Sequence, residues 1–202
     1  QVKQPLSMKP EWSEKALKLY KVFADSMFDI FGIRPFLVAG TLLGAVREGD
    51  FIAHDEDLDV AYFSTCTTAE GVRDEFFAIV RRLKEMGWGI KVGHNGGFFK
   101  VHSEDVEFDV FPSWCEAERV WMPQSQSMLA DSSLMHPPKE ALFRGHKVWY
   151  PNKPEEYLQH HYGINWRKPD PYYLERKKPG VLATLKRARL TSQQKAELRD
   201  VV

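Results

Sequence analysis

One stretch of the sequence decides the fold and chemistry of this chain: it reads Gly40-Thr41-Leu42-Leu43-Gly44-Ala45-Val46-Arg47 and, shortly after, His54-Asp55-Glu56-Asp57-Leu58-Asp59-Val60. Alternate residues of a β-strand share a face, so Asp55, Asp57 and Asp59 are expected to project the same way. Carboxylates this close repel one another and stay ionised only when a cation lies among them. Oxygen ligands of this kind suit Mg²⁺ or Mn²⁺. The stretch therefore predicts a strand with a divalent-metal site of the kind that handles phosphate.

A third carboxylate is expected from a neighbouring strand. Residues 106–111 alternate apolar side chains on one face with Glu107 and Asp109 on the other. Asp109 is the natural third metal ligand if this strand lies beside the aspartate strand. Alternatively, it acts as the base that takes the proton from an acceptor hydroxyl, and the sequence leaves both roles open.

The aspartates have two other interpretations. A solvated acidic strand face is disfavoured because acidic residues are poor strand formers, and here Asp57 and Asp59 interleave with apolar residues. An EF-hand calcium loop is excluded by its spacing. If Asp55 were its first position, Val60 would stand where glycine is needed and Cys66 where glutamate is needed.

Residues before and after the aspartates are suited to bind phosphate. A glycine at the end of a strand, here Gly40 before Thr41, lets backbone N–H groups approach a phosphate closely. The N-terminus of the following helix favours anions. Arg47 would add a fixed cation, and Lys100, on the strand before Asp109, would neutralise a diphosphate. Each signal is weak alone, since a surface arginine and a solvated strand lysine are common alternatives.

The remaining periodicity predicts an α+β fold: a small mixed β-sheet flanked by helices, with a helical appendage at the C-terminus. Residues 112–140, rich in Pro, Ser, Gln and Met, give no clear pattern. The predicted helices cover residues 11–31, 42–47, 68–86 and 154–162, followed by a basic tail over 181–200. The predicted strands are a buried strand at 36–39 ending in a Gly40-Thr41 turn, the aspartate strand at 56–63, a hairpin of 88–92 with 98–101, the strand at 106–111 and a hairpin over 143–150.

Composition excludes several classes of protein. The 202 residues contain 28 Lys+Arg and 28 Asp+Glu, so no overall field favours nucleic acid as a partner. The only cysteines, Cys66 and Cys115, form no Cys-x-x-Cys pair, which argues against structural zinc or a disulfide scaffold. No apolar run is long enough to cross a bilayer. Because the sequence begins at Gln1 without methionine, we expect a domain of a longer protein.

The C-terminal part is predicted to contribute aromatic and basic surfaces. Tyr162 and Trp166, followed by the pair Tyr172-Tyr173, would stack on a base or sugar, or they would form a satellite core. We expect a catalytic domain over residues 1–175. Residues 176–202 would be a basic tail or linker that contacts an acidic membrane surface or a partner domain, or else a solvated helix face.

Residues 40–52 with Asp55-Glu56-Asp57-Leu58-Asp59 resemble the signature of the LicD family, which includes bacterial phosphocholine transferases, fukutin and fukutin-related protein. Tyr157-Leu158, Tyr162-Gly163, Trp166 and Pro169 resemble the closing motif of that family. The resemblance implies a nucleotidyltransferase-like fold. It also implies a CDP-linked donor whose phospho-substituent passes to a sugar hydroxyl with release of CMP.

The resemblance also implies roles for individual residues. Asp57 and Asp59 would be metal ligands, Asp109 the third carboxylate, and Asp55 a supporting acid beside them. The positions that would face the donor phosphates are Gly40, Thr41 and Arg47. Where the family commonly has Pro-Trp or Pro-His before its first aspartate, this chain has Ala53-His54, which puts the local turn in question but not the metal carboxylates.

The leading hypothesis is therefore metal-dependent transfer of choline-, glycerol- or ribitol-phosphate to a cell-surface glycan such as a capsule or teichoic acid. The expected location is the cytoplasm, at the inner face of the membrane, or the Golgi lumen in a eukaryote. One alternative is a nucleotidyltransferase that attaches NMP and releases pyrophosphate. Another is a non-catalytic module that binds a nucleotide or glycan, which the cost of unpartnered buried carboxylates disfavours.

Overall fold

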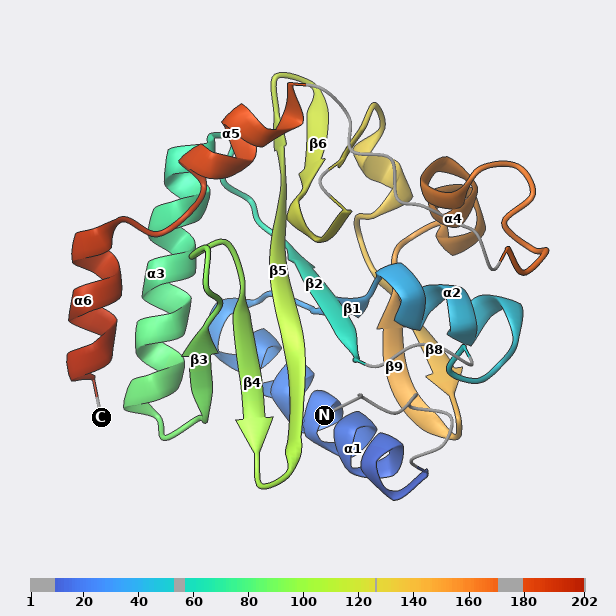
Figure 1. Cartoon of the computed structure of the whole chain (residues 1–202), viewed down its shortest axis with the longest axis horizontal. Coiled ribbons are helices and arrows are strands. Elements are labelled where there is room, and N and C mark those ends of the chain that lie inside the picture. Colours follow the sequence, from blue (N-terminus) through green and yellow to red (C-terminus); the bar gives the residue numbers. More distant parts are fainter. Residues whose placement is uncertain (1–9, 53–56, 126, 171–179, 202) are drawn as a thin grey trace.

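The computed structural model describes residues 10–52, 57–125, 127–170 and 180–201 (Figure 1). Within these residues, a mixed sheet has the strand order β1-β2-β5-β4-β3, and β6 and β7 extend it from the far half of β5. A second, two-stranded sheet pairs β8 with β9. The strands are β1 Phe36–Leu37, β2 Asp59–Phe63, β3 Ile90–Val92, β4 Phe99–Ser103, β5 Val106–Glu116, β6 Arg119–Met122, β7 Ser127–Leu129, β8 Lys139–Phe143 and β9 His146–Tyr150.

The helices flank this sheet, which confirms the α+β prediction. They are α1 Pro10–Phe31, α2 Ala39–Arg47, α3 Ala69–Glu85, α4 Pro154–Tyr162, α5 Val181–Arg187 and α6 Ser192–Asp200, with short 3-10 turns at Pro123–Ser125 and Ser132–Leu134. None of the helices in the described ranges is both long and apolar enough to span a bilayer.

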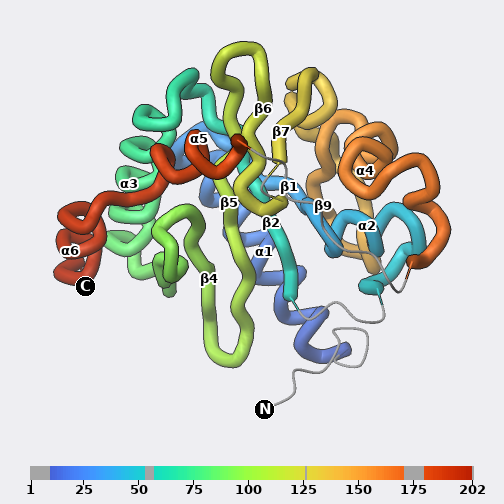
Figure 2. Tube along the Cα trace, turned by 45° about the horizontal axis from the view of Figure 1, so that its top comes forward, coloured from blue at the N-terminus to red at the C-terminus, as the bar shows by residue number. Residues whose placement is uncertain are grey.

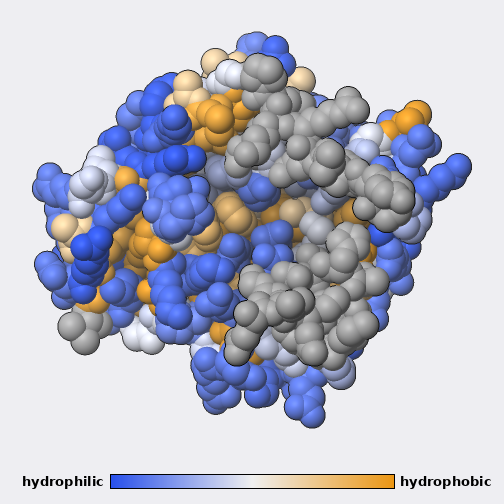
Figure 3. Space-filling view, in the orientation of Figure 1, coloured by the Kyte–Doolittle hydropathy of each residue, from blue (hydrophilic) through white to orange (hydrophobic). Residues whose placement is uncertain are grey.

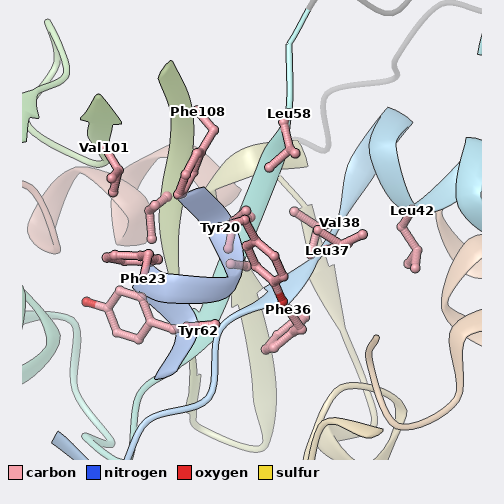
Figure 4. Packing of buried hydrophobic residues seen from close by; sticks show 14 of the residues in the cluster. Tyr20, Phe23, Phe36, Leu37, Val38, Leu42, Leu58, Tyr62, Val101 and Phe108 are labelled. Carbon is pink, nitrogen blue, oxygen red and sulfur yellow. The ribbon is translucent and has the colours of Figure 1, made fainter. Parts of the chain in front are cut away.

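One face of the sheet is buried beneath α1 and α3. Phe23 of α1 packs edge-on against Phe99 and Phe108 at centroid distances of 6.1 and 5.6 Å, and Phe76 of α3 lies 5.6 Å from Phe99. Figure 4 shows Tyr20 and Phe23 of α1 in the same buried cluster as Phe108 of β5 and Val101 of β4. Side chains at alternate positions must point away from this core, so Lys100 and Asp109 lie on the opposite face.

A close approach of the chain to α2 requires glycine at position 44. A Cβ atom there would lie 2.5 Å from the carbonyl oxygen of Asp50 and 2.9 Å from the backbone nitrogen of Ile52. The following chain therefore folds back directly onto α2 before it reaches the aspartates. On its other side, α2 contacts α4 (Figure 2).

Most predicted elements are confirmed, but the region before the aspartates is corrected. The predicted strand over 36–39 ends at Leu37, and α2 already begins at Ala39, whose φ is +50°. The turn predicted at Gly40-Thr41 is therefore wrong: both residues belong to the first turn of α2, since the positive φ of Ala39 makes the change of direction one residue earlier.

The C-terminal half holds two further corrections. β5 continues to Glu116, five residues beyond the predicted strand end at 111, and residues 112–140 contribute β6 and β7 to the sheet. The single helix predicted over 181–200 is two helices, α5 and α6, which both contact α3. The domain boundary predicted at 175/176 falls in residues 171–179, outside the described ranges, and stays a prediction.

Candidate functional site

A row of charged residues crosses the open face of the sheet. Asp59 of β2 and Asp109 of β5 are register partners in the parallel pair at the centre of the sheet. The row continues through Lys100 of β4 to Lys91 of β3. Register partners share a face, and neighbouring strands lie about 4.8 Å apart. The fold thus brings together three of the predicted site residues, Asp59, Asp109 and Lys100.

Asp109 is the buried centre of this row. It is 9% exposed, and the Nζ atom of Lys100 lies 2.7 Å from its Oδ1 atom. Burial raises the pKa of Asp109, the hydrogen bond and charge of Lys100 oppose the rise, and the charges of Asp57 and Glu107 add to it. The carboxylate is therefore held in a setting that favours an additional cation.

Lys100 lies between two carboxylates. Its Nζ atom also donates to Oε1 of Glu107 at 3.2 Å. Burial lowers the pKa of Lys100, but the hydrogen bonds and charges of Asp109 and Glu107 outweigh this effect, so the pKa lies above its usual value. The ammonium stays charged and is held beside Asp109. Glu107 was not predicted for this role from the sequence, although its position on the same strand face as Asp109 was the available signal.

Asp57 lies just before β2 and is half-buried. Its charge is close enough to add to the rise in the pKa of Asp109, so Asp57 lies near the Asp59–Asp109 pair. Asp55 lies outside the described residues, so its predicted supporting role stays a prediction.

Thr41 fastens α2 to the aspartate segment. Its side chain is fully buried; its Oγ1 atom accepts a hydrogen bond from the backbone N–H of Asp59 at 3.0 Å and donates to the carbonyl oxygen of Asp57 at 3.5 Å. The Thr41 hydroxyl is thus used to bind the backbone of Asp57 and Asp59. A phosphate would instead be contacted by the backbone N–H groups at the start of α2. Gly40 lies in that first turn, and Val38, the N-cap residue, makes no side-chain capping bond. N–H groups at such a helix start attract anions.

Arg47 lies at the opposite end of α2, roughly 9 Å from Thr41 along the helix axis. Its guanidinium donates to Oε1 of Glu48 and, at 3.3 Å, to the carbonyl oxygen of Trp166. The structure therefore joins Arg47 to the C-terminal motif and does not bring it together with Thr41. Its contact with a donor phosphate stays a prediction.

The aromatic residues of the C-terminal motif pack into the protein. Trp166 is 3% exposed and belongs to the main core. Tyr162 is half-buried, with its ring 4.4 Å from that of His161 in an edge-on contact. Trp166 therefore packs in the protein interior, as the alternative to substrate stacking has it, but in the main core and not in a satellite core. Stacking of either ring on a substrate stays a prediction, and residues 172 and 173 lie outside the described ranges.

A second aromatic pair, which was not predicted from the sequence, lies beside the charged row. Phe98 and Phe111 stack with ring centroids 5.0 Å apart. Phe111 lies two residues after Asp109 on β5, so it shares the face of Asp109. Both rings are half-buried. The available signal was the position of Phe111 on the same strand face as the predicted carboxylate.

The carboxylates of the site are of the ligand type that a divalent metal prefers. In the ranges the structure describes, no three His, Cys, Asp or Glu side chains are grouped closely enough to hold a metal, but Asp55 is outside those ranges. The register pair of Asp59 and Asp109, with Asp57 nearby, supplies the hard oxygen donors that Mg²⁺ and Mn²⁺ prefer. The pKa of Asp109 is raised mainly by burial and further by the charges of Asp57 and Glu107, and a dication would offset those charges.

The sequence is similar to a known protein family and to individual members of it over the residues that form the sheet and the site. The family described as LicD/FKTN/FKRP, nucleotidyltransferase domain, matches residues 32–153. The chain is 25% identical over 157 residues to ribitol 5-phosphate transferase FKRP of Homo sapiens, covering 74% of this chain and 31% of that protein. It is 26% identical over 167 residues to ribitol-5-phosphate transferase FKTN of Mus musculus, covering 77% and 34%. The chain spans about a third of the length of these curated relatives. Since the family match covers more than half of the sequence, from β1 through the charged row to the β8–β9 hairpin, the chain belongs to the LicD family.

Proposed function

We propose that this domain transfers a phospho-alcohol from a CDP-linked donor to a hydroxyl group of a glycan and releases CMP. The observation that carries the proposal is the register pairing of Asp59 with Asp109 beside Lys100. The relatives named above are ribitol-phosphate transferases, so ribitol phosphate is the first alcohol to test, ahead of glycerol and choline phosphate.

The metal would be held by the carboxylates of Asp57, Asp59 and Asp109. When bound, Mg²⁺ or Mn²⁺ would supply positive charge to the donor's diphosphate. Asp109 supports two roles, as a metal ligand or as the base that receives the proton of the acceptor hydroxyl. Its pKa, raised by burial, favours proton uptake more than an ordinary aspartate would.

Two further groups are placed to bind the donor. The start of α2 lies against the aspartate segment, because Thr41 is hydrogen-bonded to Asp57 and Asp59, and its N–H groups would donate hydrogen bonds to a phosphate oxygen. Lys100 would exchange its bond to Asp109 for the diphosphate when a metal takes that carboxylate. The donor's phosphates would thus lie between α2 and β4.

The test is CMP release with Mg²⁺, a panel of CDP-ribitol, CDP-glycerol and CDP-choline, and a candidate glycan acceptor for each. We expect CMP with one donor, and its loss in Asp57→Asn and Asp59→Asn proteins that retain their thermal unfolding transition. Asp105→Asn is the matched control, because Asp105 is an exposed turn residue paired with Lys15. Unchanged turnover in the Asp57 and Asp59 variants would contradict the assignment of the site.

The same assay separates the two alternatives. A nucleotidyltransferase would use the same carboxylates but release pyrophosphate from an NTP. A non-catalytic module would bind the CDP-linked donor and release neither product with any acceptor. The Asp59 and Asp109 pair favours catalysis over simple binding, because two carboxylates kept side by side are costly without a metal or a proton-transfer role.

A further inference from the structure

The strand β3 forms the outer edge of the sheet on the side of α6. It is the last strand in the strand order and, among the described strands, pairs only with β4. A cavity of about 400 Å³ lies along this edge, between β3 and α6, and none of its described lining residues is an aspartate or glutamate. In the view of Figure 3, hydrophilic side chains surround a hydrophobic strip on this side of the molecule. The edge of the sheet is thus accessible from a concave, acid-free surface.

The ladder between β3 and β4 shows which backbone groups of β3 are already bonded. The N–H of His102 donates to the carbonyl oxygen of Gly89, and the N–H of Gly93 donates to the carbonyl oxygen of Phe98, both at 2.8 Å. In an antiparallel pair, hydrogen-bonded and non-hydrogen-bonded residue pairs alternate. Lys91, two residues from each of these glycines, therefore bonds to β4 with its own N–H and C=O groups.

The backbone groups of Ile90 and Val92 point the other way, toward the free edge. Both residues are neighbours of Lys91 in β3, so they fall at the non-hydrogen-bonded positions of the ladder, and both line the cavity. In the described ranges, no backbone or side-chain group bonds to them on that side. The edge therefore presents two N–H donors and two carbonyl acceptors at alternate positions, the pattern to which a further strand can be added.

The charges of α6 are segregated toward the same cavity. Lys195 and Arg199 line it, whereas Glu197 and Asp200 line a different cavity beside Phe77. Like charges four residues apart on a helix repel each other, so α6 gains no stability from the two cations. Among the described residues, neither Lys195 nor Arg199 has an acidic side chain as an ion-pair partner. Both cations are therefore available to an external carboxylate.

Several contacts hold α6 beside this edge. Lys84 of α3 donates to the carbonyl oxygen of Leu198 at 2.6 Å. The N–H of Leu190, just before α6, donates to the carbonyl oxygen of Gly96 in the β3–β4 turn at 2.9 Å. The side chain of Lys195 lies over the same turn, since a Cβ atom on Gly96 would be 2.6 Å from its Cε atom. The two cations are thus presented at a fixed place along β3.

The spacing of these cations fits the spacing of side chains on an extended chain. Lys195 and Arg199 are separated by four residues, about 6 Å along the helix axis. Alternate side chains of a strand share a face and lie about 6.6 Å apart. In the view of Figure 1, α6 and β3 lie along similar directions. An extended segment with acidic residues at alternate positions would therefore bring one carboxylate to each cation.

Charge argues against an occupant from this chain itself. Of the two longer segments outside the described ranges, residues 1–9 carry two lysines and no acid, and residues 171–179 carry three basic residues and one acid. A second copy pairing through its own β3 would bring an equally basic edge. Like charges would repel in each case, so the complementary occupant is an acidic segment of another protein.

We propose that the β3 edge is a docking site for an extended acidic segment of a partner protein, which adds to the sheet as a further strand. Its backbone would pair with Ile90 and Val92, and its carboxylates would accept charge-assisted hydrogen bonds from Lys195 and Arg199. The edge lies two strand spacings, roughly 10 Å, from Asp109, so the partner would bind beside the candidate catalytic residues without covering them. Such docking is independent of the transfer reaction proposed above.

The first test is binding of a fluorescein-labelled heptapeptide that alternates glutamate with valine, followed by fluorescence anisotropy. We expect Lys195→Glu with Arg199→Glu to raise the Kd about tenfold, because two charge-assisted contacts are lost and replaced by repulsion. The control pair is Arg119→Glu with Lys186→Glu, which changes the net charge equally at two exposed positions outside the cavity and should change the Kd less than twofold. Lys195→Gln with Arg199→Gln gives a milder variant should the glutamates impair folding.

The second test asks whether the peptide binds as a strand. Hydrogen exchange followed by NMR should slow at the amides of Ile90 and Val92 when the peptide is bound, and should not change at Lys91, whose N–H is already bonded to β4. Two peptides N-methylated at odd or at even positions keep their charge but lose the N–H donors of one edge. Only one of the two should retain its affinity, because an added strand uses one edge of its backbone.

Five results would overturn the proposal. Three are no binding of the heptapeptide to the unmodified protein, an equal loss of affinity in both charge-reversed pairs, and unchanged exchange at Ile90 and Val92 with saturating peptide. A fourth is equally tight binding of a glycerol-phosphate hexamer with the same dependence on Lys195, which would make the cavity a general anion site. The fifth is a fall in CMP release in the Lys195→Glu, Arg199→Glu protein without peptide, which would assign the cavity to the transfer reaction.

Discussion

Nζ of Lys100 and Oδ1 of Asp109 lie 2.7 Å apart on neighbouring strands. The ion pair is half-enclosed, with side-chain exposures of 30% for Lys100 and 13% for Asp109. A carboxylate this buried needs a cation, and Lys100 provides one within the protein. A metal would compete with Lys100 for Asp109, and a diphosphate would compete with Asp109 for Lys100. Binding of either would therefore replace part of this ion pair.

Replacement of Lys100 by methionine is expected to lower kcat/KM for CMP release by about 10- to 100-fold, the cost of about 1.5–3 kcal/mol for losing a hydrogen bond to a charged group. Methionine retains much of the apolar stem but supplies no positive charge for the diphosphate. Steady-state kinetics with varied donor would measure the effect. Lys91→Met, one strand farther along the same row, is the control and should leave the KM for the donor unchanged. A Lys100→Met enzyme with normal kinetics would remove Lys100 from the donor site.

Divalent metal is expected to stabilise the protein through the same carboxylates. Ligand that binds only the folded state adds about 2.7 kcal/mol at a hundredfold excess over Kd, so Mg²⁺ or Mn²⁺ should raise the Tm and EDTA should reverse the rise. Asp59→Asn and Asp109→Asn should abolish this metal-dependent shift. Asp105→Asn should retain it, because Asp105 lies in the β4–β5 turn and pairs with Lys15. A shift that persists in the Asp59 and Asp109 variants would place the metal elsewhere.

Local patterns predicted most of the fold. The apolar spacing of α1 and α3 and the turn residues of the β3–β4 and β8–β9 hairpins depend on neighbours in sequence, so these elements were predictable. The sequence did not show the helix start at Ala39, because a positive φ is unusual for alanine and is found here beside the bond from Thr41 to the aspartate segment. The continuation of β5 to Glu116 likewise depends on its pairing with β6.

The site was partly predictable for the same reason. Alternation on a strand predicts which face Asp59 and Asp109 occupy, and the prediction that their strands are neighbours is confirmed. The hydrogen bond from Arg47 to the carbonyl oxygen of Trp166 joins positions far apart in the sequence, and no local pattern predicts it. A cavity lined by Lys84, Lys91 and Lys195 was also not predictable, since these residues come from α3, β3 and α6, and only the folding of the C-terminal residues back onto α3 brings them together.

Gly44→Ala is expected to destabilise the protein by about 1–3 kcal/mol, the usual cost of overpacking. The added methyl group would lie 2.5 Å from the backbone oxygen of Asp50 and 2.9 Å from the backbone nitrogen of Ile52, and neither backbone atom can rotate away. Because residues 50–52 lead into the aspartate segment, activity should fall together with the Tm. Thermal and urea unfolding would measure the loss. Gly49→Asn is the control: the position has φ +68° and open space, and asparagine tolerates that conformation. Wild-type stability in Gly44→Ala would show that the chain after α2 can move aside.

The attachment of α5 is expected to weaken at acid pH through Glu70. Arg187 of α5 donates to both carboxylate oxygens of Glu70 at 2.8 Å and to Oε1 of Glu116 at 2.9 Å. The hydrogen bond from Arg187 is the largest cause that lowers the pKa of Glu70, from 4.5 to about 2. A carboxylate with a lowered pKa in the folded state stabilises the fold above its unfolded pKa and loses this contribution as the pH falls through the folded value.

The contribution of Glu70 should therefore be complete at neutral pH and should disappear progressively between about pH 4.5 and pH 2. The Glu70→Gln protein is expected to be less stable than wild type at pH 7, and the difference should shrink as the pH falls through this window. Unfolding at a series of pH values, with hydrogen exchange of the α5 amides, would measure both effects. Glu140→Gln, which removes an exposed hairpin ion pair with Lys147, is the control and should not alter exchange in α5. If the difference between Glu70→Gln and wild type were the same at every pH, the ion pair with Arg187 would not be the source of the stabilisation.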